Sequence, residues 1–98
     1  MTEWPEWEFS ERREIDGPID EWVTSLDGHV YRVQIYPRYD RSIDVTMWSV
    51  YVDQITHPLA NSWICVTHIT RLQSREECVP HAEEYRARLP SYVVASVL

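Results

Sequence analysis

The chain has 98 residues, a formal net charge of −7 and a hydrophobic fraction of 44%, with five Trp and six Tyr. This composition excludes a disordered chain and predicts one folded domain, and a chain of this length can build its core without a metal or disulfides. All nine basic residues are Arg, which excludes chemistry that needs a lysine nucleophile.

The negative charge is concentrated in the first quarter of the chain. Residues 1–28 hold nine acids and two arginines, which sum to −7, whereas residues 29–98 hold seven acids and seven arginines and sum to zero. Nucleic-acid binding requires a basic stripe that contacts phosphates. The asymmetry therefore argues against direct nucleic-acid binding and predicts a protein partner with a basic surface, such as a nucleic-acid-binding complex.

The sequence contains no apolar stretch of the length that spans a membrane, and its acidic start lacks the apolar segment of a signal peptide. Two cysteines without a secretion signal are typical of a reducing compartment. We therefore expect a cytoplasmic protein with no membrane partner. The oligomeric state stays open, a homodimer included.

The predicted elements begin with a strand over residues 7–15, for which a short helix after Pro5 is the alternative. Next comes a hairpin whose arms, residues 21–26 and 29–36, flank Asp27-Gly28, because an Asp-Gly pair between β-rich runs favours a two-residue turn. Side-chain alternation assigns residues to the two faces of the second arm. One face carries Tyr31, Val33 and Ile35, and the other carries Arg32, Gln34 and Tyr36.

Two further strands follow, over residues 43–53 and 63–71, with predicted loops at residues 37–42 and 56–62. The first of these strands is apolar on both faces toward its end, which is typical of a central strand.

A helix is predicted next, because Ser74 and Glu77 have the spacing of a capping box. Its apolar stripe is Cys78, Ala82, Tyr85 and Leu89. Pro80 conflicts with a continuous helix, so the first turn is expected to be separate from a helix that starts near Pro80. The β-branched residues of 91–98 predict a last strand.

The predicted fold is α+β. It is a single domain over residues 1–98, with an antiparallel sheet of about four to six strands, one helix near the C-terminus packed on one face, and an acidic segment at 1–28.

Both cysteines are followed three residues later by a histidine, which makes Cys65, His68, Cys78 and His81 a set of zinc-ligand types. An offset of three within a strand predicts that Cys65 and His68 lie on opposite faces. Cys78 lies on the helix stripe, where a free Cys behaves as a small hydrophobic residue. We therefore expect no metal and no cofactor, and a small zinc-stabilised domain is the alternative.

The sequence contains no recognisable catalytic motif. Gly17 and Gly28 are its only glycines, so a phosphate-cradling Gly-rich loop is absent, and no strand–turn–helix nucleophile elbow is present. We expect no catalytic residues and a protein that is not an enzyme. A small ligand-binding domain or minor enzyme is the second alternative.

Acidic and aromatic residues alternate in the stretch EWPEWEFSE, residues 3–11. Carboxylates steer the approach of a basic partner and aromatic rings anchor it, so this pattern predicts a partner-binding surface. The predicted partner-binding residues are Glu3, Trp4, Glu6, Trp7, Glu8, Glu11, Glu14, Asp16, Asp20 and Glu21.

In size, charge and lack of catalytic machinery the chain is similar to small acidic inhibitors of phages and mobile elements, namely anti-CRISPR, other anti-defence and toxin-immunity proteins. That general likeness implies a stoichiometric inhibitor that occludes a basic, nucleic-acid-binding surface of its target.

Overall fold

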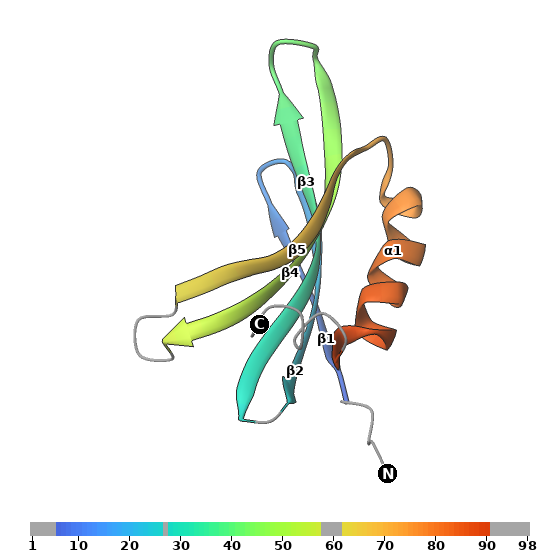
Figure 1. Cartoon of the computed structure of the whole chain (residues 1–98). Helices are drawn as coiled ribbons and strands as arrows, with labels where there is room; N and C mark the ends of the chain where they lie inside the picture. The colour runs from blue at the N-terminus through green and yellow to red at the C-terminus, as the bar shows by residue number, and fades with distance from the viewer. Residues whose placement is uncertain (1–5, 27, 58–61, 91–98) are drawn as a thin grey trace.

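The computed structural model describes residues 6–26, 28–57 and 62–90 of the chain. Its elements are β1 (Glu8–Glu14), β2 (Gly17–Leu26), β3 (His29–Asp40), β4 (Val45–His57), β5 (Ser62–Leu72) and α1 (Arg75–Ala87). The five strands form one sheet in the order β1-β2-β3-β4-β5, with every neighbouring pair antiparallel. Figure 1 shows α1 alongside this twisted sheet, and the fold is α+β as the sequence predicts.

The first strand and the hairpin predicted around residues 27–28 are confirmed, although β2 begins at Gly17, before the predicted arm of residues 21–26. β1 occupies Glu8–Glu14 and pairs with β2, and the turn between β2 and β3 contains Gly28 at a φ of 81°. A positive φ is the backbone conformation that glycine adopts without steric cost, which explains the Asp-Gly signal. The predicted last strand at 91–98 lies outside the described residues.

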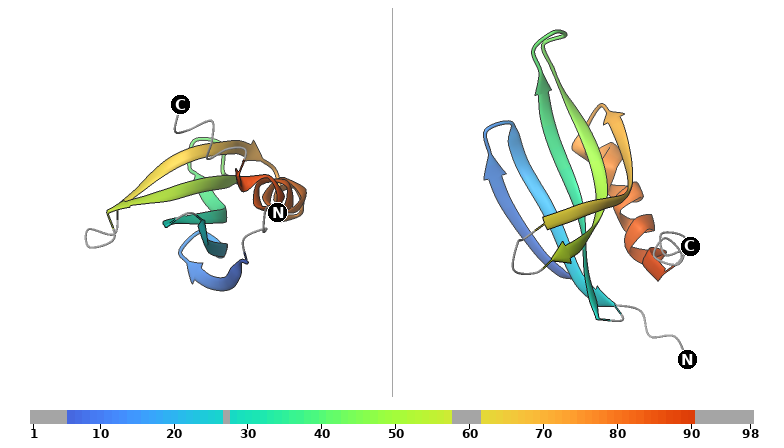
Figure 2. Two further views of the ribbon diagram at one scale, coloured as in Figure 1. Left: turned by 60° about the horizontal axis from the view of Figure 1, so that its bottom comes forward. Right: turned by 60° about the vertical axis from the view of Figure 1, so that its left-hand side comes forward.

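The predicted loop at residues 37–42 is wrong, because β3 continues to Asp40 and turns only at residues 41–44. Pairing between β2 and β3 ends at Ile35, so on that side Pro37 has no hydrogen-bond ladder to interrupt. The paired arms continue to Asp40 opposite Val45, beyond the reach of both neighbouring strands. The β3–β4 hairpin therefore protrudes from the sheet, as Figure 2 shows.

The helix begins with the predicted cap. The Ser74 hydroxyl accepts a hydrogen bond from the Glu77 N–H at 3.2 Å, and the Glu77 carboxylate accepts one from the Gln73 N–H at 2.9 Å. The predicted break at Pro80 is wrong: α1 runs through the proline, with Cys78 and Ala82 buried on either side of it. Among the described residues, no helix is long and apolar enough to cross a membrane.

One buried cluster joins the helix to the middle of the sheet. Its members are Tyr31, Val33, Ile35, Val50, Val52, Cys78, Ala82 and Leu89. The face assignment of β3 is confirmed, because all three residues predicted to share one face lie in this cluster. Of the predicted helix stripe, only Tyr85 is partly exposed, and it packs against the cluster.

A buried ion pair joins α1 to β2. Asp20 is 1% exposed, and its carboxylate accepts a hydrogen bond of 2.7 Å from the Arg75 Nε. A buried carboxylate without a cation is costly, so this contact fixes the first turn of α1 against the second strand.

Replacing Leu89 tests the contribution of the buried cluster. Leu89→Ala is expected to lower the free energy of unfolding by about 2–5 kcal/mol, because it removes a side chain with no exposed surface and leaves a cavity. Val79→Ala is the control, since Val79 is 38% exposed, and it should change stability by less than about 0.5 kcal/mol. Urea unfolding of the three chains measures both values, and equal midpoints for all three would contradict the cluster.

Replacing Arg75 tests the buried ion pair. Arg75→Ala leaves the Asp20 carboxylate buried without its cation, and should cost about 2 kcal/mol; the Arg75 side chain is 41% exposed, so the loss falls short of that for a fully buried pair. Arg88→Ala removes an exposed pair with Glu84 and should cost less than about 0.5 kcal/mol. If the two variants unfold at the same urea concentration, the buried pair contributes no more than the surface pair.

Candidate functional site

Some residues of the predicted acidic surface are exposed, and others are buried or form ion pairs within the domain. Every residue of β1 is exposed, as is Glu6 just before it. Trp7 is partly buried and packs against the core, whereas Phe9 is 54% exposed. Glu3 and Trp4 lie outside the described residues.

Two of the predicted partner-binding acids do not belong to an exposed surface. Asp20 is buried with Arg75, and the Glu21 side chain is 15% exposed and pairs with Arg12 at 2.7 Å. The physical reason is their position on β2, which has a neighbouring strand on either side, so that both side chains lie among others. These two acids are removed from the predicted surface.

Five predicted acids remain in the described chain, and three of them form what we call the acidic edge: Glu6, Glu8 and Glu11. All three are exposed, and none forms an ion pair within the part of the chain that the structure describes. Asp16 is partly buried in the turn between β1 and β2 and lies apart from that edge. Glu14 differs, because it lies 3.2 Å from the Arg12 Nε and accepts a hydrogen bond of 3.0 Å from the Tyr36 hydroxyl. This hydrogen bond is the main cause of a raised pKa for Tyr36.

The sheet has an open face on the side away from α1. A row of paired residues crosses all five strands on this face: Ser10, Glu21, Gln34, Tyr51 and His68. Among the described residues, no helix or strand lies over it. Parts of this face are nevertheless buried, since Gln34 is 4% exposed and Ser49 is 7% exposed.

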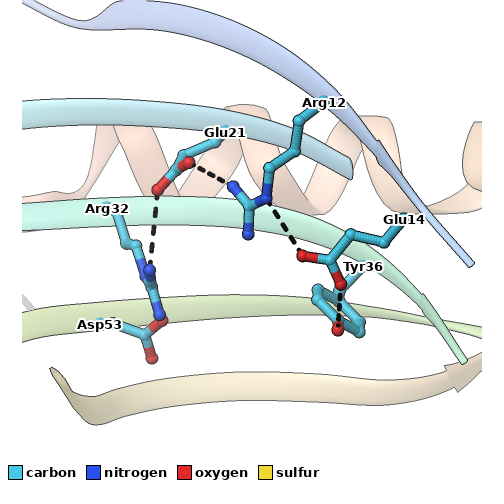
Figure 3. Close-up of polar contacts among 6 residues, drawn as sticks. All are labelled: Arg12, Glu14, Glu21, Arg32, Tyr36 and Asp53. Carbon is cyan, nitrogen blue, oxygen red and sulfur yellow. Dashed lines mark hydrogen bonds and ion pairs between the residues drawn. The ribbon is translucent and has the colours of Figure 1, made fainter. Parts of the chain in front are cut away.

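Alternating charges cross the open face, as Figure 3 shows. The Arg32 Nε donates to the Asp53 carboxylate at 2.8 Å, and Arg32 also lies 3.7 Å from Glu21. Glu21 in turn pairs with Arg12, and Arg12 pairs with Glu14. These charges of the open face thus neutralise one another, and the acidic edge holds the exposed acids of the described N-terminal segment that have no ion pair.

The prediction that Cys65 and His68 lie on opposite faces is wrong. Val52 pairs with Thr67 and Asp53 pairs with Cys65, so β5 carries one extra residue, Val66, in a β-bulge. Because of the extra residue, Cys65 and His68 pair with Asp53 and Tyr51, which are two residues apart on β4. The side chains of Cys65 and His68 therefore both lie on the open face. The Cys65 Sγ lies 3.6 Å from the His68 Nδ1.

The four zinc-ligand types are not brought together. Cys78 belongs to the buried cluster on the α1 side of the sheet, whereas Cys65 and His68 lie on the open face. The sheet therefore separates the two pairs, Cys78 with His81 and Cys65 with His68. Within the described ranges, no group of three or more His, Cys, Asp or Glu is placed to hold a metal ion.

A second bulge in β5 places Arg71 on the open face. Val50 pairs with Ile69 and Trp48 pairs with Leu72, so Thr70 and Arg71 together oppose a single residue of β4. Arg71 has a φ of 64°, a left-handed conformation that is uncommon for a residue with a side chain. Both residues line a hollow, which we call the hairpin hollow, where the β3–β4 hairpin leaves the sheet.

The hairpin hollow also contains Arg38 and Arg41, and sequence analysis did not single out any of its three arginines. Arg38 and Arg41 flank Asp40 in the segment that was predicted to be a loop. Their spacing is the available signal, but nothing in the sequence indicates that Arg71 lies beside them.

No family model matches the chain, and no curated protein or solved structure is similar to it. Its function is therefore inferred from its own residues and their geometry.

The two thiols should differ in reactivity. Burial raises the pKa of Cys78 to about 11, and burial followed by the charge of Asp53 raises the pKa of Cys65 above its ordinary value. Because the thiolate is the reactive form, a thiol reagent at pH 8 should modify exposed Cys65 slowly and leave Cys78 intact until the chain unfolds. The rate at Cys65 should rise with pH as its thiolate fraction grows.

Mass spectrometry of the modified chain measures this difference. Folded Cys65→Ser is the control, and it should stay unmodified until denaturant is added. Modification of Cys78 in that folded variant, at the rate seen for Cys65, would contradict the burial of Cys78.

Proposed function

We propose that this chain is a non-enzymatic protein-binding module that inhibits its target by covering a basic, nucleic-acid-binding surface. One observation carries the proposal: the acidic edge lies on the outermost strand, and Glu6, Glu8 and Glu11 are exposed without an ion pair in the described chain. Three unpaired carboxylates on one edge attract a cationic surface over a longer range than paired charges do.

The acidic edge also supplies an apolar contact. Phe9 lies between Glu8 and Glu11 in sequence, and its ring centroid is 5.2 Å from that of Trp22, which holds the ring in place. An exposed aromatic ring surrounded by charges is a common anchor of protein interfaces. Phe9 therefore takes the anchoring role in this proposal, because Trp7 packs against the core.

As part of this proposal, we infer that the chain acts in the manner of small anti-defence or immunity proteins, which it resembles in size and charge. Of the predicted partner-binding set, the proposal keeps the exposed acids of the N-terminal segment and leaves out Asp20 and Glu21, which are bound internally. The open face is not the proposed protein-binding surface, because its charges are largely paired with one another.

Charge reversal tests the proposal. Glu8→Arg with Glu11→Arg should abolish most capture of the target from a cell lysate, because it replaces attraction by repulsion. Reversal is preferred to neutralisation, since an uncharged edge strand would be prone to pair with other chains. Glu76→Arg with Glu83→Arg is the matched control: both residues are exposed on α1 and unpaired in the described chain, and capture should persist.

Three measurements complete the test. Proteins captured by the two variants are compared by quantitative mass spectrometry, and nucleic acid is added as a competitor. With the purified target, the β1 variant should associate at least about tenfold more slowly at low salt, and the difference should shrink at high salt. Equal capture by both variants, or a captured protein that nucleic acid does not displace, would refute the proposal.

A further inference from the structure

The hairpin hollow gathers positive charge on an otherwise acidic chain. Arg38, Arg41 and Arg71 line it, and none of them forms an ion pair within the described ranges. Four of the other six arginines pair with a carboxylate: Arg12, Arg32, Arg75 and Arg88. Arg86 lies over the Trp22 ring, and Arg13 on β1 has no ion pair in the described chain. Three unpaired guanidinium groups around one hollow need an explanation other than internal stability.

The strands give the hollow its shape. β4 supplies the floor with Met47, Ser49 and Tyr51, since β4 lies between β3 and β5 in the sheet. Arg38 lines it from β3, Arg71 from the bulge in β5, and Arg41 from the turn at the hairpin tip. The hollow has a volume of about 720 Å³, which is within the range of small-molecule sites.

The charge of the lining favours a doubly charged anion. Asp40 is the one acid of the hollow among the described residues, and its Oδ1 accepts hydrogen bonds from the Ser42 N–H at 2.9 Å and the Ser42 hydroxyl at 2.6 Å. Three arginines and one aspartate sum to a charge of +2. A phosphate monoester carries a charge of about −1.5 to −2 at pH 7, and planar guanidinium groups match phosphate oxygens in pairs.

A second hollow of about 550 Å³ continues from Arg38 and Tyr51 along the open face. Gln34 lines it, and within the described part of the chain its side-chain nitrogen is buried without a hydrogen-bond partner, as is the Asp20 Oδ1 on the other side of the sheet. Buried donors without an acceptor are rare in proteins, and an ordered water or a bound ligand can satisfy such a group. A ligand that reaches past Tyr51 would bring an acceptor close to this amide.

From these observations we propose that the hairpin hollow binds a small phosphate monoester. The phosphate lies among Arg38, Arg41 and Arg71, and the organic part rests on Tyr51 and extends toward Gln34. A nucleoside monophosphate has this chemistry, because it joins one phosphate to a flat ring with hydrogen-bond acceptors. This inference stands apart from the proposed function, since it rests on no residue of the acidic edge.

Nuclear magnetic resonance titration tests the site. The full chain, labelled with nitrogen-15 in a phosphate-free buffer, is titrated with adenosine 5′-monophosphate, with adenosine and with inorganic phosphate. We expect the monophosphate to shift the amide signals of residues 38–51 and 70–71, and adenosine to bind at least about tenfold more weakly. Inorganic phosphate should shift the signals nearest the three arginines at higher concentration.

Three variants locate the binding site. Arg38→Gln and Arg71→Gln should each weaken binding of the monophosphate at least about tenfold. Arg13→Gln removes the same charge from an exposed position on β1, where the arginine has no ion pair in the described chain, and should weaken binding less than about twofold. All three arginines are exposed, so the variants should fold.

Three outcomes would overturn the proposal. The first is no shift with millimolar monophosphate. The second is equal binding of adenosine and its monophosphate, which would mean that the phosphate is not recognised. The third is equal weakening by Arg13→Gln and Arg71→Gln, which would mean that the ligand responds to net charge and not to the hairpin hollow.

Discussion

One short helix is too small to cover both faces of a five-stranded sheet, and much of this structure follows from that constraint. α1 has 13 residues, about 20 Å at the usual rise, and its buried side chains meet those of β3 and β4. The opposite face has to satisfy its own polar groups. Long side chains that pair across strands meet much of this need, so that Arg32 and Glu21 take part in one network, although the Gln34 side-chain nitrogen has no partner among the described residues.

Local patterns predicted the elements well, because each depends on residues close in sequence. The Asp-Gly turn, the Ser74 cap and the alternation along β3 are of this kind. The bulges of β5 were not predictable in the same way. No glycine or proline marks either one, and a bulge arises from how β5 fits β4 across the sheet; the alternation rule therefore placed Cys65 and His68 on opposite faces.

The sequence predicts how many charged residues each part of the chain holds, but it does not predict which of them pair with one another. The sequence shows nine acids in its first 28 residues, but it does not show that Asp20 meets Arg75, 55 residues later. Counting alone therefore overstates the acidic surface. It also hides the arginines of the hairpin hollow, because residues 29–98 sum to zero while their charges are separated in space. The domain thus presents two surfaces of opposite sign, the acidic edge and the hairpin hollow.

The backbone conformation of Arg71 lowers the stability of the fold while it holds a guanidinium group at the hairpin hollow. Its left-handed φ of 64° costs a residue with a β-carbon about 1–2 kcal/mol, whereas glycine adopts it freely. Glycine at this position would therefore relieve strain and make the fold more stable, but it would take one guanidinium group away from the hairpin hollow. The exposed side chain of Arg71 thus stands at the hollow on a backbone that a smaller residue would adopt at lower free energy, so the strain of one residue accompanies the position of one charge.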